Sequence, residues 1–325
     1  MGQTAEAILS EQVKWRHYSL LKSSVDQTRL IIADAPKEST AFSFLVIGDT
    51  DSGLLPKKAN GQSNYDADFL AYFSQQVIAQ QQHSRFCLHT GDVTYPTGSF
   101  ENYLTGFLSP YRALLSQLPQ RPTYRTGDVV FARPFLPVPG NHDYANLPWQ
   151  RRSWQRLLKI GADVLNAIFK SHLGPYGGEG GKAYGQTFLD DLSGLSDSQL
   201  SDYLVRHYSA LVEAPNAAAN YCLDYRPGEF TRLPNRYYSF SYGGIDFFAL
   251  DSNTWNMAPE HPRFDHEQLA WLEQSLLQSW KNPKTTGRII YLHHSPYTSE
   301  YSRSQRLSTL WVRRHLRQVF DQVAL

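Results

Sequence analysis

The chain has 325 residues, of which 41% are hydrophobic and 19% charged, and its formal net charge is +1. These values are typical of a globular protein and exclude a disordered one. The balance of acidic and basic residues gives no basic excess of the kind that binds nucleic acids or acidic membranes. The length is sufficient for one large domain or two smaller ones.

Membrane and secretion signals are not evident in the sequence. No stretch approaches the ~18 apolar residues of a membrane span, and the N-terminal segment lacks the apolar core of a signal peptide. The two cysteines, Cys87 and Cys222, do not make a disulfide framework. We therefore expect a soluble, cytoplasmic protein without a membrane segment or a nucleic-acid patch, and the sequence leaves the question of protein partners open.

Strand-like runs alternate with helical patterns over the first 144 residues. In the helical pattern after the second run, Phe69, Phe73 and Val77 recur every four residues. This alternation is typical of an α/β architecture. The expected strands cover 29–34, 41–49, 85–92 and 135–141, and the expected helices cover 65–82 and 100–117.

Residues 145–235 break this rhythm and are expected to form a mainly helical insertion. Helices are predicted over 147–173 and over 197–213, and the second opens with the capping-box pattern Ser196-x-x-Gln199. A glycine-rich stretch, 174–185, lies between them. Such an insertion is either a lid over a site or a surface elaboration without a role in chemistry.

The core pattern resumes after the insertion. Residues 237–253 predict a hairpin that turns at Gly243 and Gly244, and Asp265 with Gln268 predicts the start of a helix. A further strand is expected over 287–297 and a last helix over 304–321. We therefore expect a single domain, 1–325, with its core in 29–144 and 236–325.

Four of the apolar strands end in residues that bind metals. Because sites in α/β sheets gather beyond the carboxyl ends of strands, these residues are expected to meet. Oxygen donors mixed with imidazole, without thiolate, suit Fe, Mn or Zn, and several carboxylates at one point need cations between them. A pair of such ions could clamp a phosphate group. The candidate residues are Asp49, Asp51, Asp92, Tyr95, Asn141, His142, Asp143, His293 and His294.

The motifs that carry these residues resemble a known set. Gly-Asp at 48–49, Gly-Asp-x-x-Tyr at 91–95, Gly-Asn-His-Asp at 140–143 and His-x-Pro at 294–296 are similar, in the same order, to the motifs of calcineurin-like metallophosphoesterases. The tyrosine variant resembles purple acid phosphatases. The resemblance implies a four-layer α/β/β/α sandwich that hydrolyses small phosphate esters by attack of a metal-bound hydroxide, using two metal ions.

The resemblance also implies which residues bind the ions. Asp49 would bind the first metal, and Asp92 would bridge both. Tyr95 would bind the first metal as a phenolate, which favours ferric iron. Asn141 would bind the second metal through its amide oxygen, together with His294.

Other residues are expected to act beside the ligands. His142 would donate a proton to the leaving oxygen, oriented by Asp143. His293 is expected to contact the metal ligands or to lie in the core without binding a metal itself, because His294 is the histidine that matches the His-x-Pro spacing. Asp51 would either bind the first metal or face solvent. No glycine-rich nucleotide motif accompanies these residues.

The final Gly-His-x-His motif of the family is absent from the sequence. One explanation is a truncated chain whose sheet lacks its C-terminal strands, which would leave an exposed edge. A second is a degenerate, non-catalytic relative that binds metal weakly or not at all. A third is substitution of the missing imidazoles by Asp51 and His293.

Two further functions compete with the metallophosphoesterase hypothesis. Asp49-Thr50-Asp51 is similar to the nucleophile motif of haloacid-dehalogenase-like phosphatases, in which Asp49 would attack phosphorus itself. Gly53 stands where that motif has Thr or Val. The other alternative is a non-catalytic binding protein that works through the aromatic-rich insertion.

Overall fold

The structure is a computed structural model, and not every residue of the chain is described. The expected helix over 147–173, and with it much of the expected lid, lies outside the described residues. The described residues are 25–36, 38–51, 65–119, 125, 127–144, 181–190, 192, 195–210, 221–300, 304 and 306–323.

The first sheet has three short parallel strands. They are β2 (Leu45–Ile47), β3 (Cys87–His89) and β6 (Phe135–Pro137), paired in the order β2-β3-β6. The expected strands at 41–49, 85–92 and 135–141 contain them, with shorter paired cores. Since all three strands are parallel, the residues that follow them emerge at one edge of the sheet.

The second sheet has six strands in the order β11-β10-β9-β1-β8-β7. Strands β10 and β11 are parallel, while β9 and β10 form an antiparallel hairpin. Its strands are β1 (Val25–Ile32), β7 (Tyr208–Ala210), β8 (Tyr221–Tyr225), β9 (Tyr238–Tyr242), β10 (Ile245–Leu250) and β11 (Gly287–Leu292).

The β9–β10 hairpin forms as predicted. Its two turn residues, Gly243 and Gly244, have φ angles of 55° and 84°. Both angles lie in the left-handed region that glycine adopts without strain, and a two-residue turn of this kind matches the twist of the flanking strands. Tyr242 therefore pairs directly with Ile245.

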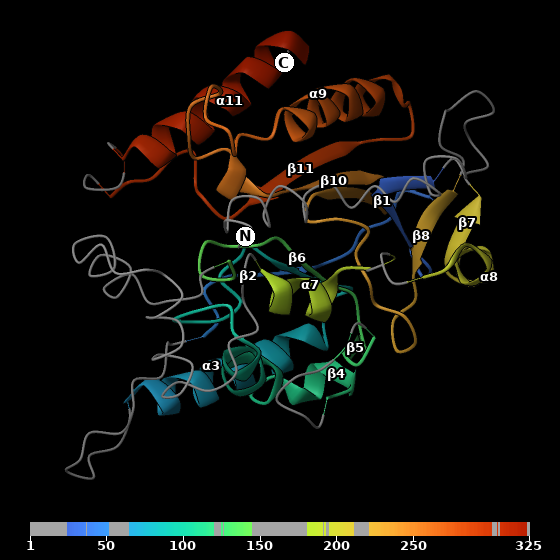
Figure 1. Ribbon diagram of the computed structural model, residues 1–325, viewed down its shortest axis with the longest axis vertical. Coiled ribbons are helices and arrows are strands. Elements are labelled where there is room, and N and C mark those ends of the chain that lie inside the picture. The colour runs from blue at the N-terminus through green and yellow to red at the C-terminus, as the bar shows by residue number, and fades with distance from the viewer. Residues whose placement is uncertain are drawn as a thin grey trace.

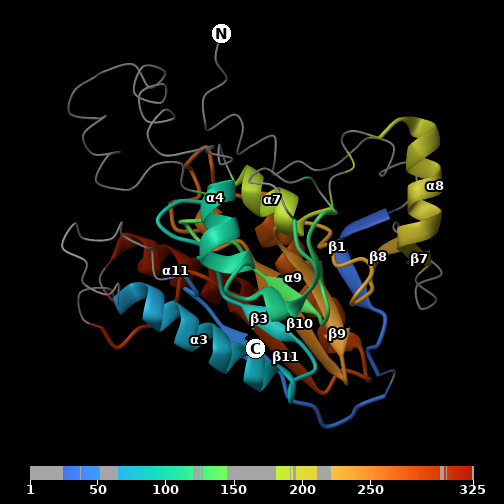
Figure 2. The same cartoon turned by 90° about the horizontal axis from the view of Figure 1, so that it is seen from below.

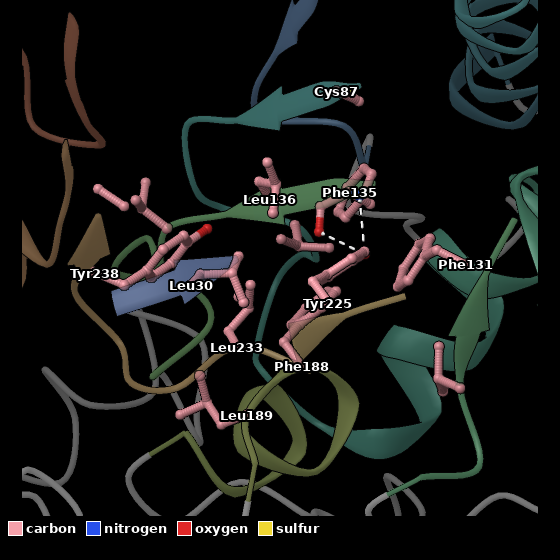
Figure 3. Close-up of a cluster of buried hydrophobic side chains, with 14 of the residues drawn as sticks. Leu30, Cys87, Phe131, Phe135, Leu136, Phe188, Leu189, Tyr225, Leu233 and Tyr238 are labelled. Atoms are coloured by element: carbon pink, nitrogen blue, oxygen red, sulfur yellow. Dashed lines mark hydrogen bonds between the residues drawn. The ribbon is translucent and has the colours of Figure 1, made fainter. Parts of the chain in front are cut away.

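The main hydrophobic core lies between the two sheets. Tyr225 of β8 donates its hydroxyl to the carbonyl oxygen of Phe135 at 3.3 Å, which joins the six-stranded sheet to the three-stranded one. Figure 3 shows side chains of both sheets, including Leu30, Leu136 and Tyr238, gathered in this interior. These three side chains are each at most 2% exposed.

Helices α9 (His266–Lys281) and α11 (Leu307–Val323) cover the other face of the six-stranded sheet, over β10 and β11 (Figure 1). Phe248 and Leu250 of β10 pack with Leu272 and Leu276 of α9 in a second hydrophobic cluster. Strand β10 is thus apolar on both faces, as a central strand between two layers must be. Helix α3 (Tyr65–Gln81) lies on the opposite side of the molecule (Figure 1).

The prediction of one helix over 100–117 is wrong. The chain forms α4 (Phe100–Asn102), a π-helical turn (Tyr103–Leu108) and a 3₁₀ turn (Arg112–Leu114), and then enters strand β4 (Leu115–Gln117). Pro110 interrupts the helix because its nitrogen cannot donate a hydrogen bond. Strand β4 pairs with β5 (Val130–Phe131), so tertiary pairing overrides helical periodicity after the proline.

The described part of the expected insertion is not purely helical. Helix α7 (Lys182–Phe188) begins within the glycine-rich stretch, and α8 (Asp197–His207) is shorter than the helix predicted over 197–213. The capping box of Ser196 and Gln199 is present. Strands β7 and β8 belong to the six-stranded sheet, and α8 lies beside them (Figure 2).

The mixed α/β class is therefore confirmed, while the complete four-layer order and the division into core and insertion stay predictions. Helix α9 starts at its predicted N-cap, Asp265, whose side chain accepts the backbone N–H of Gln268. Among the helices that the structure describes, none combines the length and apolar character needed to cross a membrane.

Candidate functional site

Two candidate carboxylates follow neighbouring parallel strands in the same unusual backbone conformation. Asp49 comes two residues after β2 with φ 50°, and Asp92 comes three residues after β3 with φ 52°. A non-glycine residue in this region costs of order 1–3 kcal/mol, and such strain is concentrated at functional sites. The backbone N–H of Asp49 donates to the carbonyl oxygen of Gly91 at 3.1 Å, which ties the two turns together.

The hydroxyl of Tyr95 lies between the two carboxylates. Its oxygen is 2.5 Å from Oδ1 of Asp49 and 2.6 Å from Oδ2 of Asp92. A phenol has one proton and can donate to only one of these oxygens. Burial, followed by the contacts with Asp49 and Asp92, raises the pKa of Tyr95 well above its usual value. The three oxygens thus form an electron-rich group that a cation would stabilise.

His293 faces the same carboxylate from the other sheet. Its Nδ1 is 3.0 Å from the carbonyl oxygen of Thr90, so Nδ1 carries a proton. Its Nε2 is then directed at two further oxygens, Oδ2 of Asp92 at 3.3 Å and Oδ1 of Asn141 at 3.2 Å. Either a second proton or a cation between these atoms makes this arrangement favourable.

The pKa of Asp92 reflects these neighbours. Burial alone would raise the pKa, but the contacts with His293, with the Tyr95 hydroxyl and with the backbone N–H of His142 lower it to about 2. The N–H of His142 donates to Oδ1 of Asp92 at 2.8 Å. Asp92 is therefore an ionised carboxylate at the centre of the cluster.

His294, the expected ligand of the second metal, is placed apart from this cluster. Its Nδ1 is 2.9 Å from Oγ of Ser252, and its Nε2 is 3.5 Å from Nδ2 of Asn256. Burial, followed by the nearby His293, lowers its pKa to about 4, so the ring is neutral at pH 7. Of the two adjacent histidines, His293 rather than His294 contacts Asp92 and Asn141.

The side chains of β11, the strand before the two histidines, alternate between the two layers. Tyr291 points into the interior between the sheets, where its hydroxyl donates to that of Tyr238, while Ile290 and Leu292 pack against the helices. Successive side chains of an extended strand point to opposite faces. His293 and His294 follow directly after Leu292, the last residue of β11, and their rings contact different groups: His293 contacts Asp92 and Asn141, and His294 contacts Ser252.

His142 stands beside Tyr95 with its ring half-buried. The two ring centroids are 4.2 Å apart. Nδ1 of His142 lies 2.9 Å from the carbonyl oxygen of Pro96 and therefore carries a proton. This leaves Nε2 as the ring nitrogen that can exchange a proton with a substrate.

Asp143 has hydrogen bonds other than the one expected with His142. Its carboxylate accepts the hydroxyl of Tyr103 at 2.6 Å and the backbone N–H groups of Gly140 at 2.8 Å and Val93 at 3.1 Å. Burial, followed by the charge of Asp92, raises its pKa to about 7. Asp143 thus joins the turn after β6 to the turn after β3.

Asp51 likewise makes contacts within the fold. Its Oδ2 accepts the hydroxyl of Thr94 at 3.1 Å and the backbone N–H of Tyr95 at 2.9 Å. The π-helical turn approaches the same oxygen so closely that a Cβ on Gly106 would lie 1.9 Å from it. Asp51 is 5% exposed and positions the backbone that carries Tyr95.

A buried ion network that the sequence analysis did not identify lies next to the site. Arg236, 3% exposed, contacts the carboxylates of Asp251 and Asp265. Asp251 follows β10 and also accepts the hydroxyl of Tyr144 at 2.9 Å. The position of Asp251 after an apolar strand was a usable signal, but no sequence motif marks Arg236.

The oxygen and nitrogen atoms around Asp92 are of the kinds that hard metal ions bind, although they come from several residue types. In the part of the chain that the structure describes, no three His, Cys, Asp or Glu side chains group closely enough to hold an ion on their own. The atoms that converge on Asp92 are instead mixed: carboxylates, the Tyr95 phenol, the Asn141 amide and the His293 imidazole. Oxygen-rich sets with imidazole suit Mn, Fe or Zn, and a cation would offset the repulsion among the crowded oxygens.

Comparison with known proteins agrees with this geometry. Residues 42–320 match the family model described as calcineurin-like phosphoesterase. The chain belongs to this family. The matched segment contains all the strand ends described above, and the match gives no support to the haloacid-dehalogenase-like alternative, which rested on the single segment at Asp49–Gly53.

The comparisons with individual proteins gave a distant structural match. No curated protein matches the chain. A solved structure titled "GAP50 the anchor in the inner membrane complex of Plasmodium" is similar, with 14% sequence identity and a TM-score of 0.37. The similarity covers 87% of this chain and 62% of that chain, so this chain spans less than two thirds of that protein's length.

Proposed function

We propose that the protein is a metal-dependent phosphoester hydrolase whose site is centred on Asp92. The observation that supports this most directly is the crowding of acceptor atoms around Asp92, with one phenol proton between two carboxylates and one imidazole nitrogen facing two oxygens. Family membership supports phosphoester hydrolysis as the reaction. Small phosphate esters are the proposed substrates.

Two ions would be held on either side of Asp92. One would contact Asp49, Asp92 and Tyr95, and the other would contact Asp92, Asn141 and His293. When bound, such ions lower the pKa of water and neutralise phosphate oxygens. Iron, manganese and zinc all suit these donors.

The residues of the chain supply positioning and proton transfer. The N–H of His142 holds Oδ1 of Asp92, which fixes the central carboxylate in one orientation. The carbonyl of Pro96 fixes the His142 ring through Nδ1, so that a proton on Nε2 can be given to the leaving oxygen of the substrate. Tyr95 packs against this ring and restricts its rotation.

The proton-donor role predicts a selective loss of turnover. We expect protein treated with a chelator and reloaded with Mn²⁺ to hydrolyse p-nitrophenyl phosphate, and His142→Gln to lower kcat by roughly 10²–10⁴-fold, the range of general acid–base catalysis. Metal affinity should be retained, because the backbone N–H that contacts Asp92 remains. Steady-state kinetics and calorimetric metal titration measure the two effects, and full activity of this variant would exclude the role.

The pair His293 and His294 offers a matched test of the ligand assignment. Only His293 contacts Asp92 and Asn141, so we expect His293→Ala to weaken Mn²⁺ binding more than roughly 100-fold, beyond the loss typical of an outer partner. His294→Ala should have a smaller effect, because its ring contacts Ser252. Calorimetric titration measures the Mn²⁺ affinity of both variants. A larger loss of affinity in His294→Ala than in His293→Ala would identify His294 as the ligand.

A degenerate, non-catalytic relative that binds metal weakly or not at all is the second candidate. The contacts among Tyr95, Asp49 and Asp92 favour it, since the phenol proton partly replaces a countercharge. So does the finding that no three His, Cys, Asp or Glu side chains of the described residues group as a metal site. Weak or undetectable Mn²⁺ binding together with no hydrolysis of p-nitrophenyl phosphate would identify this function.

A further inference from the structure

A histidine outside the family motifs connects the turns that carry the two strained carboxylates. His89 is the last residue of β3 and is fully buried. Its ring lies between aromatic neighbours, with centroids 6.3 Å from Phe107 and 5.7 Å from Phe135. A polar ring in such apolar surroundings is costly unless its nitrogens are hydrogen-bonded.

Both ring nitrogens of His89 have partners, and these partners fix the tautomer. The backbone N–H of Gly91 donates to Nδ1 at 3.1 Å, so Nδ1 is an acceptor. The proton of the neutral ring is then on Nε2, which donates to Oγ1 of Thr50 at 2.9 Å. Burial lowers the pKa of His89 to about 3, in agreement with a neutral ring.

His89, Thr50, Gly91 and Val93 form a chain of hydrogen bonds, called the relay below. From Thr50 this chain continues to Val93, which follows Asp92. The hydroxyl of Thr50 donates to the carbonyl oxygen of Val93 at 3.3 Å. Gly91 and Val93 flank Asp92, and Thr50 follows Asp49. His89 therefore binds the backbone on one side of Asp92 directly, and it reaches the backbone on the other side through the side chain of Thr50, the residue after Asp49.

We propose that His89 is a positioning residue that sets the relative placement of the Asp49 and Asp92 carboxylates through Thr50, Gly91 and Val93. This inference rests on the proposed function, because it assigns the purpose of the relay to metal binding. Asp49 and Asp92 both have a left-handed backbone conformation. Such strained conformations persist only when interactions with the surrounding structure stabilise them. An apolar side chain at position 89 would leave the Gly91 N–H without this acceptor.

The test uses substitutions that keep shape and remove hydrogen bonds. Thr50→Val removes the hydroxyl at nearly constant volume, Thr50→Ser keeps it, and His89→Phe removes both nitrogens. We expect Thr50→Val and His89→Phe each to weaken Mn²⁺ binding by roughly 10- to 100-fold, the loss typical of an outer partner of a metal ligand. Thr50→Ser should bind as the wild type does, and the double variant should be no weaker than His89→Phe.

A remote histidine provides the control for lost stability. His315, 1% exposed, has Nε2 3.0 Å from the carbonyl oxygen of Met257 and packs beside Trp255 and Phe264. His315→Phe should lower the melting temperature without changing Mn²⁺ affinity. If folded Thr50→Val and His89→Phe protein bound Mn²⁺ as tightly as the wild type, the positioning role would be overturned.

Hydrogen exchange separates this inference from the proposed function. If the wild type does not bind Mn²⁺, the proposed function fails. The hydrogen bonds of the relay can then still be tested by amide exchange in the metal-free protein. We expect His89→Phe to speed exchange of the Gly91 amide, which has lost its acceptor, and of the Asp49 amide, which donates to Gly91. Unchanged protection of the Asp49 amide would show that the relay does not link the two turns.

Discussion

Asp92→Asn is expected to abolish metal-dependent hydrolysis. The carboxylate of Asp92 contacts Tyr95 and His293 and accepts the backbone N–H of His142, so all the other groups are arranged around it. An amide in its place removes the negative charge, keeps one oxygen acceptor and presents an N–H to one of these neighbours. Activity should fall by more than roughly 100-fold, which exceeds the loss seen when a residue that only contacts a metal ligand is replaced.

The matched control for this variant is Asp246→Asn. Asp246 is likewise a carboxylate that accepts several hydroxyls, from Ser241, Ser279 and Thr285, but it lies in the six-stranded sheet, near the start of β10. Hydrolysis of p-nitrophenyl phosphate by Mn²⁺-loaded protein should be lost only in Asp92→Asn. Equal activity of the two variants would place the reaction away from Asp92.

Arg236→Leu is expected to cause the largest loss of stability. The guanidinium is buried between Asp251 and Asp265, and its removal leaves two buried carboxylates without a countercharge. Breaking a buried ion pair in this way costs ~3–5 kcal/mol. Asp251 also accepts the hydroxyl of Tyr144, directly after the Gly-Asn-His-Asp segment, so the site should loosen as well.

Urea denaturation measures this effect, with Arg226→Leu as the control. The side chain of Arg226 is 28% exposed, and its contacts with Asp224 and Glu229 are 3.9 and 3.5 Å long. Exposed pairs of this kind contribute about 0.2–1 kcal/mol. If both variants lost a similar, small amount of unfolding free energy, the buried network would not be a stabilising element of the fold.

Local patterns in the sequence predicted the elements that depend on local chemistry. Gly243 and Gly244 determine a two-residue turn, and Asp265 caps its helix, because these features need only neighbouring residues. The helix expected beyond Pro110 failed for a tertiary reason, since Leu115 pairs with Phe131 in a strand. A periodic pattern alone does not reveal such long-range pairing.

The candidate site was predictable to a similar extent. The strand-end motifs located Asp49, Asp92, Tyr95 and Asn141 at one edge, as the parallel strands require. The His-x-Pro spacing selected His294, whereas in the folded chain His293 contacts Asp92, and that contact depends on how the turn after β11 meets the turn after β3. The partners of Asp143 and His89 come from turns that meet only in the folded chain.

Anomalous diffraction from crystals of the full chain soaked in Mn²⁺ tests the central claim most directly. We predict anomalous peaks beside Asp92, on its Tyr95 side and on its Asn141 and His293 side. These peaks should be absent from crystals of Asp92→Asn. Wild-type crystals with no peak beside Asp92, or with Mn²⁺ bound only elsewhere, would contradict the assignment of this cluster as a metal-dependent hydrolytic site.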